Sequence, residues 1–166
     1  MLIIINNYSE RDIVDGIKYL LKQSTENPDV DTLANRIISQ DLGSYIKAVH
    51  DWVSNNVAYV RDPIVGDSEI ELFISPVRMA KDYLAGKQLA GDCDDHALLT
   101  TALYRALNFD ARVVLLSFSG GGWEHAVAEV YSEKLAQTTN PWLTIDSTVK
   151  EFPAGWPEEA VRRLVV

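Results

Sequence analysis

The sequence predicts an α+β fold in which a layer of helices packs on an antiparallel β-sheet. Apolar residues recur at helical spacing through the first half of the chain, and runs rich in Val, Leu and Ala follow in the second half. Between them lies a further helical segment that begins at the chain's single cysteine, Cys93. We expect this helix to pack on the sheet, because each element must bury its apolar face against another layer.

The N-terminal part contains a short apolar run followed by three helical segments. Met1 to Ile5 predicts a first strand or a buried terminal segment. Apolar stripes typical of helices begin after Ser9, after the Asn27-Pro28 break, and at about Ser44. We interpret all three stripes as structural, because stripes at this spacing usually face a core.

The middle of the chain is less regular. Asn56 to Arg61 predicts an extended segment, whereas the acidic stretch from Pro63 to Ile74 has no clear assignment. Ser75-Pro76 supplies an N-cap followed by a proline at the first helical position, and Gly86 indicates where this short helix ends. The helix that begins at Cys93 has Asp92 as its expected N-cap, and its pattern runs to about Leu107.

Three β-like runs follow this helix, at Arg112 to Phe118, His125 to Tyr131 and Leu143 to Ser147. The short links between them predict neighbouring antiparallel strands. The tail from Phe152 to Val166 is interpreted as a strap across the domain, with a short helical stretch from Glu158.

Composition excludes several classes of function. The 166 residues carry a formal net charge of −9, and no cluster of basic residues stands out, so we expect no nucleic-acid partner. No apolar run is long enough to cross a membrane, and the short apolar N-terminus lacks the features of a signal peptide. We therefore expect a cytoplasmic protein. With a single cysteine, an intrachain disulfide is impossible.

Cys93 is either a small buried apolar residue or a nucleophile. A helix N-terminus favours an anion and lowers the pKa of a thiol, whereas Asp92, Asp94 and Asp95 disfavour a thiolate. Placement at the helix end would not activate this cysteine unaided, so a cationic neighbour is needed. A histidinium would supply that charge.

Three histidines could take this role. His50 lies among core-type residues, and His96 lies one turn along the same helix as Cys93, so packing roles are favoured for both. His125 begins a strand directly after a glycine-rich loop. If that strand pairs with the next one, Asp146 can hold one imidazole nitrogen and orient the other towards Cys93.

Four sequence blocks resemble the bacterial transglutaminase-like superfamily. They are Gly91-Asp92-Cys93-Asp94-Asp95-His96-Ala97, Leu107-Asn108-Phe109-Asp110-Ala111-Arg112-Val113-Val114, Trp123-Glu124-His125-Ala126-Val127-Ala128-Glu129-Val130 and Trp142-Leu143-Thr144-Ile145-Asp146. Each block alone is a weak signal, but the combination is specific and covers roughly Trp52 to Ser147. The resemblance implies a papain-like fold. It also implies one transglutaminase-like domain over residues 1–166, with a core of about 44–150 and the N-terminal helices 9–40 packed on it.

The resemblance also implies roles for individual residues. Cys93 would form a thioester with an acyl donor, His125 would carry the proton, and Asp146 would orient His125. Tyr59 is the favoured second oxyanion donor and Gln88 is a competing candidate. Separately from the resemblance, Trp123 and the glycine-rich loop indicate an accessible cleft beside the site, which makes Trp123 a substrate-site candidate.

The sequence thus predicts a cysteine hydrolase or acyltransferase that acts on peptide-type amide bonds of a peptide or protein substrate. The first alternative is a binding or structural module that keeps the fold without turnover, and the second is a metal-dependent protein. We expect no cofactor and no metal. The run from Asp92 to His96 lacks the spaced ligand pairs of zinc sites, and the chain has no loop with calcium-site spacing.

Overall fold

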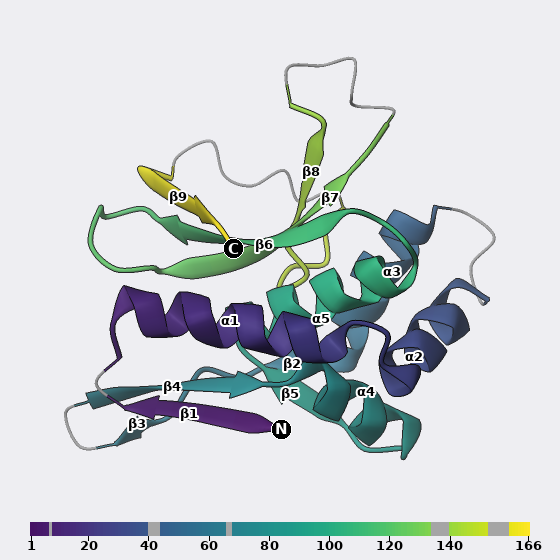
Figure 1. The fold of residues 1–166 in the computed structure, drawn as a ribbon, viewed down its shortest axis with the longest axis horizontal. Helices are drawn as coiled ribbons and strands as arrows, with labels where there is room; N and C mark the ends of the chain where they lie inside the picture. The colour runs from purple at the N-terminus through teal and green to yellow at the C-terminus, as the bar shows by residue number, and fades with distance from the viewer. Residues whose placement is uncertain (7, 40–43, 66–67, 134–139, 153–159) are drawn as a thin grey trace.

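The computed structural model describes residues 1–6, 8–39, 44–65, 68–133, 140–152 and 160–166, and within these ranges it contains five helices and nine strands. Figure 1 shows two sheets separated by helices, with α5 near the centre of the molecule. The mixture of helices and antiparallel sheets confirms the predicted α+β class.

The largest sheet has four antiparallel strands in the order β8-β7-β6-β9. These strands are β6 (Ala111–Ser117), β7 (His125–Tyr131), β8 (Trp142–Ile145) and β9 (Arg162–Val165). Helix α5 (Cys93–Ala106) contacts β6 and β7 (Figure 1). The predicted packing of the cysteine helix on an antiparallel sheet is therefore confirmed.

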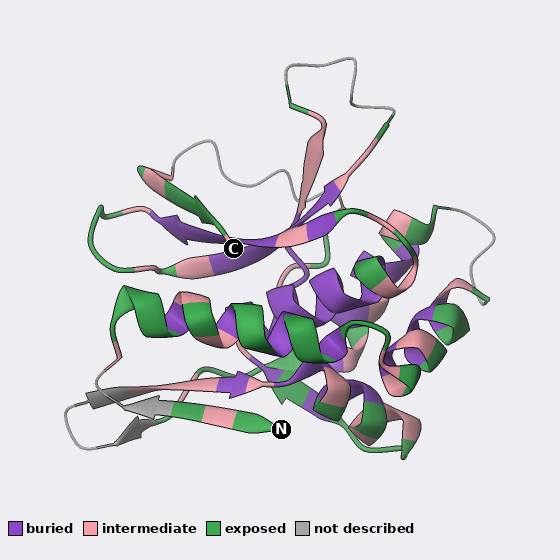
Figure 2. Cartoon of the chain, viewed as in Figure 1, coloured by how far each residue is buried: buried purple, intermediate pink, exposed green. Residues whose placement is uncertain are grey.

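Helix α5 is buried on nearly every side. Each residue from Asp94 to Tyr104 is buried, and Figure 2 shows this helix as the most continuously buried element of the fold. An amphipathic surface helix would alternate between buried and exposed faces. Helix α5 instead contacts the other four helices as well as the sheet, which is why its sequence carries so few charged residues after the first turn.

The four other helices form the layer that the apolar stripes predict. They are α1 (Glu10–Ser24), α2 (Pro28–Ile38), α3 (Tyr45–Asn56) and α4 (Pro76–Leu84). Ser9 and Asp12 form a reciprocal capping box at the start of α1, and Ser75 caps α4 ahead of its first-turn proline. None of the described helices is both long enough and apolar enough to traverse a bilayer.

A second, smaller sheet has the order β1-β4-β3. Strand β1 (Leu2–Asn6) confirms the expected N-terminal strand, and it pairs antiparallel with β4 (Ser68–Ile74). Strands β3 (Ile64–Val65) and β4 account for the acidic stretch that the pattern left unassigned. The short strands β2 (Val57–Tyr59) and β5 (Leu89–Gly91) pair in parallel.

The C-terminal segment differs from the prediction. A short helical stretch was expected from Glu158, which itself lies outside the described residues. Residues 162–165 form strand β9, which pairs antiparallel with the edge of β6. The helical prediction is wrong over these four residues because pairing with β6 satisfies their backbone groups, and Arg163 gains an ion pair with Glu129 of β7.

Candidate active site

Cys93 is the first residue of α5 and is partly buried. The parallel pairing of β2 with β5 leads the chain into this position, because Gly91 lies opposite Tyr59 at the end of that ladder. Asp92 occupies the N-cap position as expected, but its side chain makes no capping hydrogen bond. A Cβ on Gly91 would lie 2.5 Å from the Asp95 side chain, so this approach of the chain to α5 requires glycine.

The Cys93 sulfur lies against the start of β7. It accepts hydrogen bonds from the backbone N–H groups of Ala126 and Asp94, and both contacts favour the thiolate. Burial of the thiol and the nearby charge of Asp92 act in the opposite direction and dominate, so the pKa of Cys93 is raised to about 12. The free site therefore holds a neutral thiol at neutral pH.

His125 and Asp146 meet where β7 begins and β8 ends. Ala128 pairs with Ile145 in the β7–β8 ladder, and this register brings the residue after β8 towards the start of β7. The result is a hydrogen bond of 2.8 Å between His125 Nε2 and Asp146 Oδ2. His125 keeps 19% of its side chain exposed, whereas Asp146 keeps only 4%.

Asp146 is held as an anion. Burial by itself would raise its pKa, but hydrogen bonds from His125 and Thr148 outweigh burial and lower it. Thr148 donates both its backbone N–H and its hydroxyl to Asp146 Oδ1, at 2.9 and 2.6 Å. A carboxylate can only accept, so the hydrogen of this bond belongs to His125 Nε2, and in the neutral imidazole Nδ1 is the nitrogen that bears the lone pair.

A cavity of about 370 Å³ opens beside the sulfur. Cys93, His125, Trp123 and Tyr59 all line it, so four of the predicted site residues meet at one cavity. Asp146 lies behind His125 and does not line it. The Trp123 ring packs under the Arg162 guanidinium, 4.6 Å from its centroid, which fixes one wall of this cavity.

The two oxyanion candidates occupy different places. Tyr59 lines the cavity that contains Cys93, and burial raises the pKa of its phenol. Gln88 lines a second cavity, of about 650 Å³, which Tyr59 and His96 also line. Among the described lining residues of the Cys93 cavity, Gln88 is absent.

His50 and His96 both lie in the core. His50 is fully buried in α3, and its ring packs against Phe152. His96 donates from Nδ1 to the Ser147 carbonyl oxygen at 3.0 Å, and burial lowers its pKa. One turn further along α5, the Thr100 hydroxyl bonds the Ser147 hydroxyl at 2.9 Å. Helix α5 thereby holds the segment that follows Asp146.

Acidic side chains gather around Cys93, and sequence reasoning identified only some of them. Asp92, Asp94 and Asp95 were visible in the cysteine block, and one carboxylate oxygen from each lies within 4.8 Å of the others, close enough to share a cation. Asp62 and Glu71 also line the Cys93 cavity and were missed. The alternation of Ile70, Leu72 and Ile74 with their neighbours was the signal for the strand that carries Glu71.

Residues 31–147, more than half of the chain, match the family described as the transglutaminase-like superfamily. The fold is similar to the crystal structure of a proposed cysteine protease from Cytophaga hutchinsonii, with a TM-score of 0.54 and 22% sequence identity. That similarity covers 96% of this chain and 53% of the Cytophaga protein, so the chain spans about half the length of this relative.

Two other solved structures are more distantly similar. Calcium-bound LapG from Legionella pneumophila has a TM-score of 0.45 and 19% identity over 87% of this chain and 68% of LapG. A TGase has a TM-score of 0.39 and 18% identity over 91% of this chain and 35% of its own. A comparison with curated proteins gave no significant match. The family match confirms the resemblance of the sequence blocks, and the chain belongs to the transglutaminase-like superfamily.

Proposed function

We propose that the protein is a cysteine hydrolase or acyltransferase that acts on peptide-type amide bonds. The observation that carries this proposal is the shared cavity of Cys93 and His125, with Asp146 bonded to the imidazole nitrogen Nε2. A nucleophile, a base and a third group that fixes the tautomer are the three parts of a catalytic triad.

The reaction begins with transfer of the Cys93 proton to His125 Nδ1 as the sulfur attacks the substrate carbonyl carbon. The imidazolium that forms lies next to the Asp146 carboxylate, which stabilises its charge. His125 then returns the proton to the amine as the C–N bond breaks, and the acyl group remains on Cys93 as a thioester. Because the free thiol has a pKa of about 12, proton transfer accompanies attack and does not precede it.

The negative charge on the carbonyl oxygen needs hydrogen-bond donors during attack. The backbone N–H at the start of α5 is one donor, because the first N–H groups of a helix have no partner within the helix. The Tyr59 hydroxyl is the second, since Tyr59 lines the Cys93 cavity and Gln88 lines the neighbouring one.

The thioester is resolved by water in a hydrolase or by an amine in an acyltransferase, and the same triad serves both outcomes. His125 activates the second nucleophile as it activated the first. The substrate is a peptide or protein, and no cofactor takes part in these steps.

The second candidate is a binding module without turnover. The specific observation in its favour is the raised pKa of Cys93, which burial and Asp92 produce. A buried thiol without an effective base reacts slowly with electrophiles. The two candidates therefore differ in whether His125 governs the reactivity of the sulfur.

Labelling with iodoacetamide at pH 7 separates them. Cys93 is the chain's only cysteine, so mass spectrometry of the intact protein reads this one site. We expect the His125→Ala variant to label at least about tenfold more slowly than the wild type, and the two proteins to label equally once denatured in urea. Equal rates in the folded proteins would favour the binding module, and loss of activity with EDTA would favour a metal-dependent protein.

Turnover supplies the second test. Cys93→Ala and Cys93→Ser should keep the wild-type circular dichroism spectrum and lose hydrolysis and transfer on a peptide substrate. Wild-type turnover by Cys93→Ala would eliminate the mechanism.

A further inference from the structure

The cavity beside Cys93 is acidic. Its lining contains Asp62, Glu71, Asp92 and Asp94, whereas Arg61 is the only Lys or Arg among the described lining residues. The four carboxyl groups come from separate parts of the chain, since Asp62 follows β2, Glu71 lies in β4, and the other two flank Cys93. Their common feature is that they face the space a substrate must enter.

Within the described residues, these carboxyl groups are not engaged in ion pairs. None of the four forms an ion pair with a Lys, Arg or His in the part of the chain that the structure describes. Asp94 is only 6% exposed, yet its Oδ1 has no hydrogen-bond partner among the described residues. Buried carboxyl groups are costly to ionise without a partner, so a positive charge that enters this cavity would be stabilised by them.

Glu71 and Asp94 are hydrogen-bonded to each other through their side chains. Two ionised carboxylates cannot share a hydrogen bond, so one of them carries a proton. Burial together with Glu71 and Asp92 raises the pKa of Asp94 well above its usual value. A positive charge next to this pair would favour release of that proton.

Glu124 also lines the cavity but differs from these four. Its Oε2 accepts hydrogen bonds from the Ser117 hydroxyl and from the backbone N–H groups of Phe118 and Ser119. Those contacts hold the loop between β6 and β7 and satisfy the carboxylate. Glu124 therefore stabilises the loop between β6 and β7 at the edge of the cavity.

We propose that this cavity binds the Lys or Arg side chain of a peptide substrate close to the scissile amide, with the cationic group between Asp62, Glu71 and Asp92. This inference rests on the proposed function, because it assigns a substrate class to the same site. Both carboxylates and apolar surface are needed to hold such a side chain, since its methylene stem is apolar. Ile13, Ile70 and Leu115 line the same cavity and supply that surface.

The proposed position of the organic cation differs from the place where a metal ion could bind. A cavity of about 370 Å³ far exceeds the space of a single ion, and its carboxyl groups are spread over several elements. The carboxylate oxygens that lie within 4.8 Å of one another belong to Asp92, Asp94 and Asp95, and neither Asp62 nor Glu71 is part of this group. Within that group, Asp95 Oδ1 already accepts the Ile74 N–H at 2.6 Å.

A bound cation would also favour the chemistry. Burial and the charge of Asp92 raise the pKa of Asp62 to about 7, so the carboxyl groups repel one another in the free site. Asp92 and Glu71 also contribute, after burial, to the raised pKa of Cys93. A positive side chain between them offsets this repulsion and lowers the cost of forming a thiolate.

The test uses four matched peptide vinyl sulfones that differ in one side chain: lysine, N-acetyl-lysine, norleucine or glutamate. Each alkylates Cys93, and the second-order rate constant is measured by intact-protein mass spectrometry in EDTA at low salt. The lysine probe should react at least about tenfold faster than N-acetyl-lysine, with glutamate slowest, because only lysine carries the positive charge. The ratio of the lysine to the N-acetyl-lysine rate constant should fall as ionic strength rises, because salt screens the attraction between the charges.

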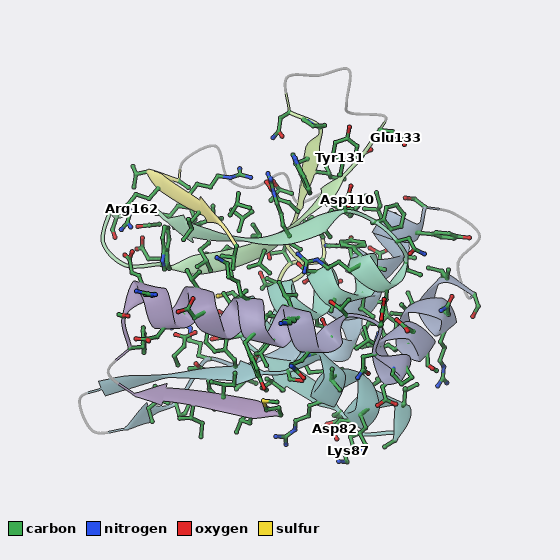
Figure 3. The ribbon with its side chains drawn as sticks, in the orientation of Figure 1. Asp82, Lys87, Asp110, Tyr131, Glu133 and Arg162 are labelled. Carbon is green, nitrogen blue, oxygen red and sulfur yellow. The ribbon has the colours of Figure 1, made fainter. Side chains whose placement is uncertain are left out.

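Variants locate the source of the preference. Asp62→Asn and Glu71→Gln should each reduce the ratio of the lysine to the N-acetyl-lysine rate by at least about threefold. Glu133→Gln and Asp110→Asn remove the same charge from the far end of β7, where Figure 3 labels both residues, and should leave the ratio unchanged.

The outcomes separate this inference from the proposed function. If no probe labels Cys93 in a His125-dependent way, the proposed function fails. If all four probes react in that way at equal rates, the function stands and the cationic-substrate inference is wrong. If EDTA abolishes labelling by every probe and added Ca²⁺ restores it, the carboxylates hold a metal ion and the inference is overturned.

Discussion

His125 Nε2 and Asp146 Oδ2 lie 2.8 Å apart although 21 residues separate them in the sequence. Neither residue lies in the middle of a strand: one opens β7 and the other follows β8. Antiparallel pairing of these strands is what brings the two ends together. The imidazole is thereby held through Nε2, and Nδ1 is the nitrogen that would receive the Cys93 proton in the proposed mechanism.

Replacement of Asp146 by asparagine should lower kcat/KM by about a thousandfold, because the amide can donate to Nε2 and so reverse the tautomer of His125. Thr148→Val removes one of the bonds to Asp146 Oδ1 and should cost less than about tenfold. Steady-state kinetics on one peptide substrate compares the two variants. A smaller loss for Asp146→Asn than for Thr148→Val would contradict the orienting role.

Tyr59→Phe should lower kcat by about a hundredfold with little change in KM, because the hydroxyl acts on the oxyanion only during attack. Tyr59 is 49% exposed, so the thermal midpoint of unfolding should not move. Gln88→Ala is the matched control and should retain wild-type kcat. The reverse pattern would transfer the donor role to Gln88.

Gly91→Ala should destabilise the fold by about 1–3 kcal/mol, because the new Cβ would lie 2.5 Å from the Asp95 side chain. The strain falls two residues before Cys93, so reactivity of the thiol should fall as well. Gly122→Ala meets nothing within 4 Å and serves as the control. Urea unfolding of both variants gives the free-energy change, and wild-type stability of Gly91→Ala would show that the approach is not tight.

Stability should fall as pH rises from about 4 to 8. Burial and Asp92 raise the pKa of Asp62 to about 7, whereas its usual value is 3.8, so the folded protein binds more protons than the unfolded chain in this interval. The stabilising contribution of such a group is complete below pH 3.8 and is lost as pH passes through 7. Burial raises the pKa of Asp95 to about 8 and extends the interval upward.

Thermal unfolding in a pH series measures this effect. The midpoint should be higher at pH 5 than at pH 8, and Asp62→Asn should reduce the difference because its amide does not titrate. Asp110→Asn, an exposed surface control, should leave the difference unchanged. A midpoint that rises with pH would reverse the sign and refute the argument.

Glu129→Gln should destabilise the protein by about 3–5 kcal/mol, since it removes a buried charge that two arginines share. Glu129 is fully buried, lies 2.7 Å from Arg112 and also pairs with Arg163 of β9. Arg163→Ala removes a partner that is 41% exposed and should cost about 1 kcal/mol or less. Chemical denaturation ranks the two, and equal costs would mean that the ion pairs do not depend on burial.

The sequence predicted the helices and three of the four strands of the large sheet, β6, β7 and β8, because their apolar periodicity is regular. Ser9, Ser75 and the first-turn prolines identified helix starts through hydrogen bonds that are local in sequence. Strand β9 was missed because four residues give little periodicity, and their conformation depends on a distant partner, β6.

The candidate site was accessible to sequence reasoning to the extent that it is built from recognisable blocks. Cys93, His125 and Asp146 each stand in such a block, and strand pairing explains how the last two meet. Asp62 and Glu71 have no motif, because the folded chain brings the segment after β2 and strand β4 to the cavity that Cys93 lines. Electrostatic surroundings of this kind follow from tertiary structure and leave little trace in local sequence.

Cys93 lies at the N-terminal end of helix α5. His96 and Thr100 of the same helix form hydrogen bonds with Ser147, the residue after Asp146. The position of Asp146 relative to Cys93 is thus tied to one helix through the residue that follows Asp146. Changes at His96 or Thr100 would therefore act on Asp146 through Ser147.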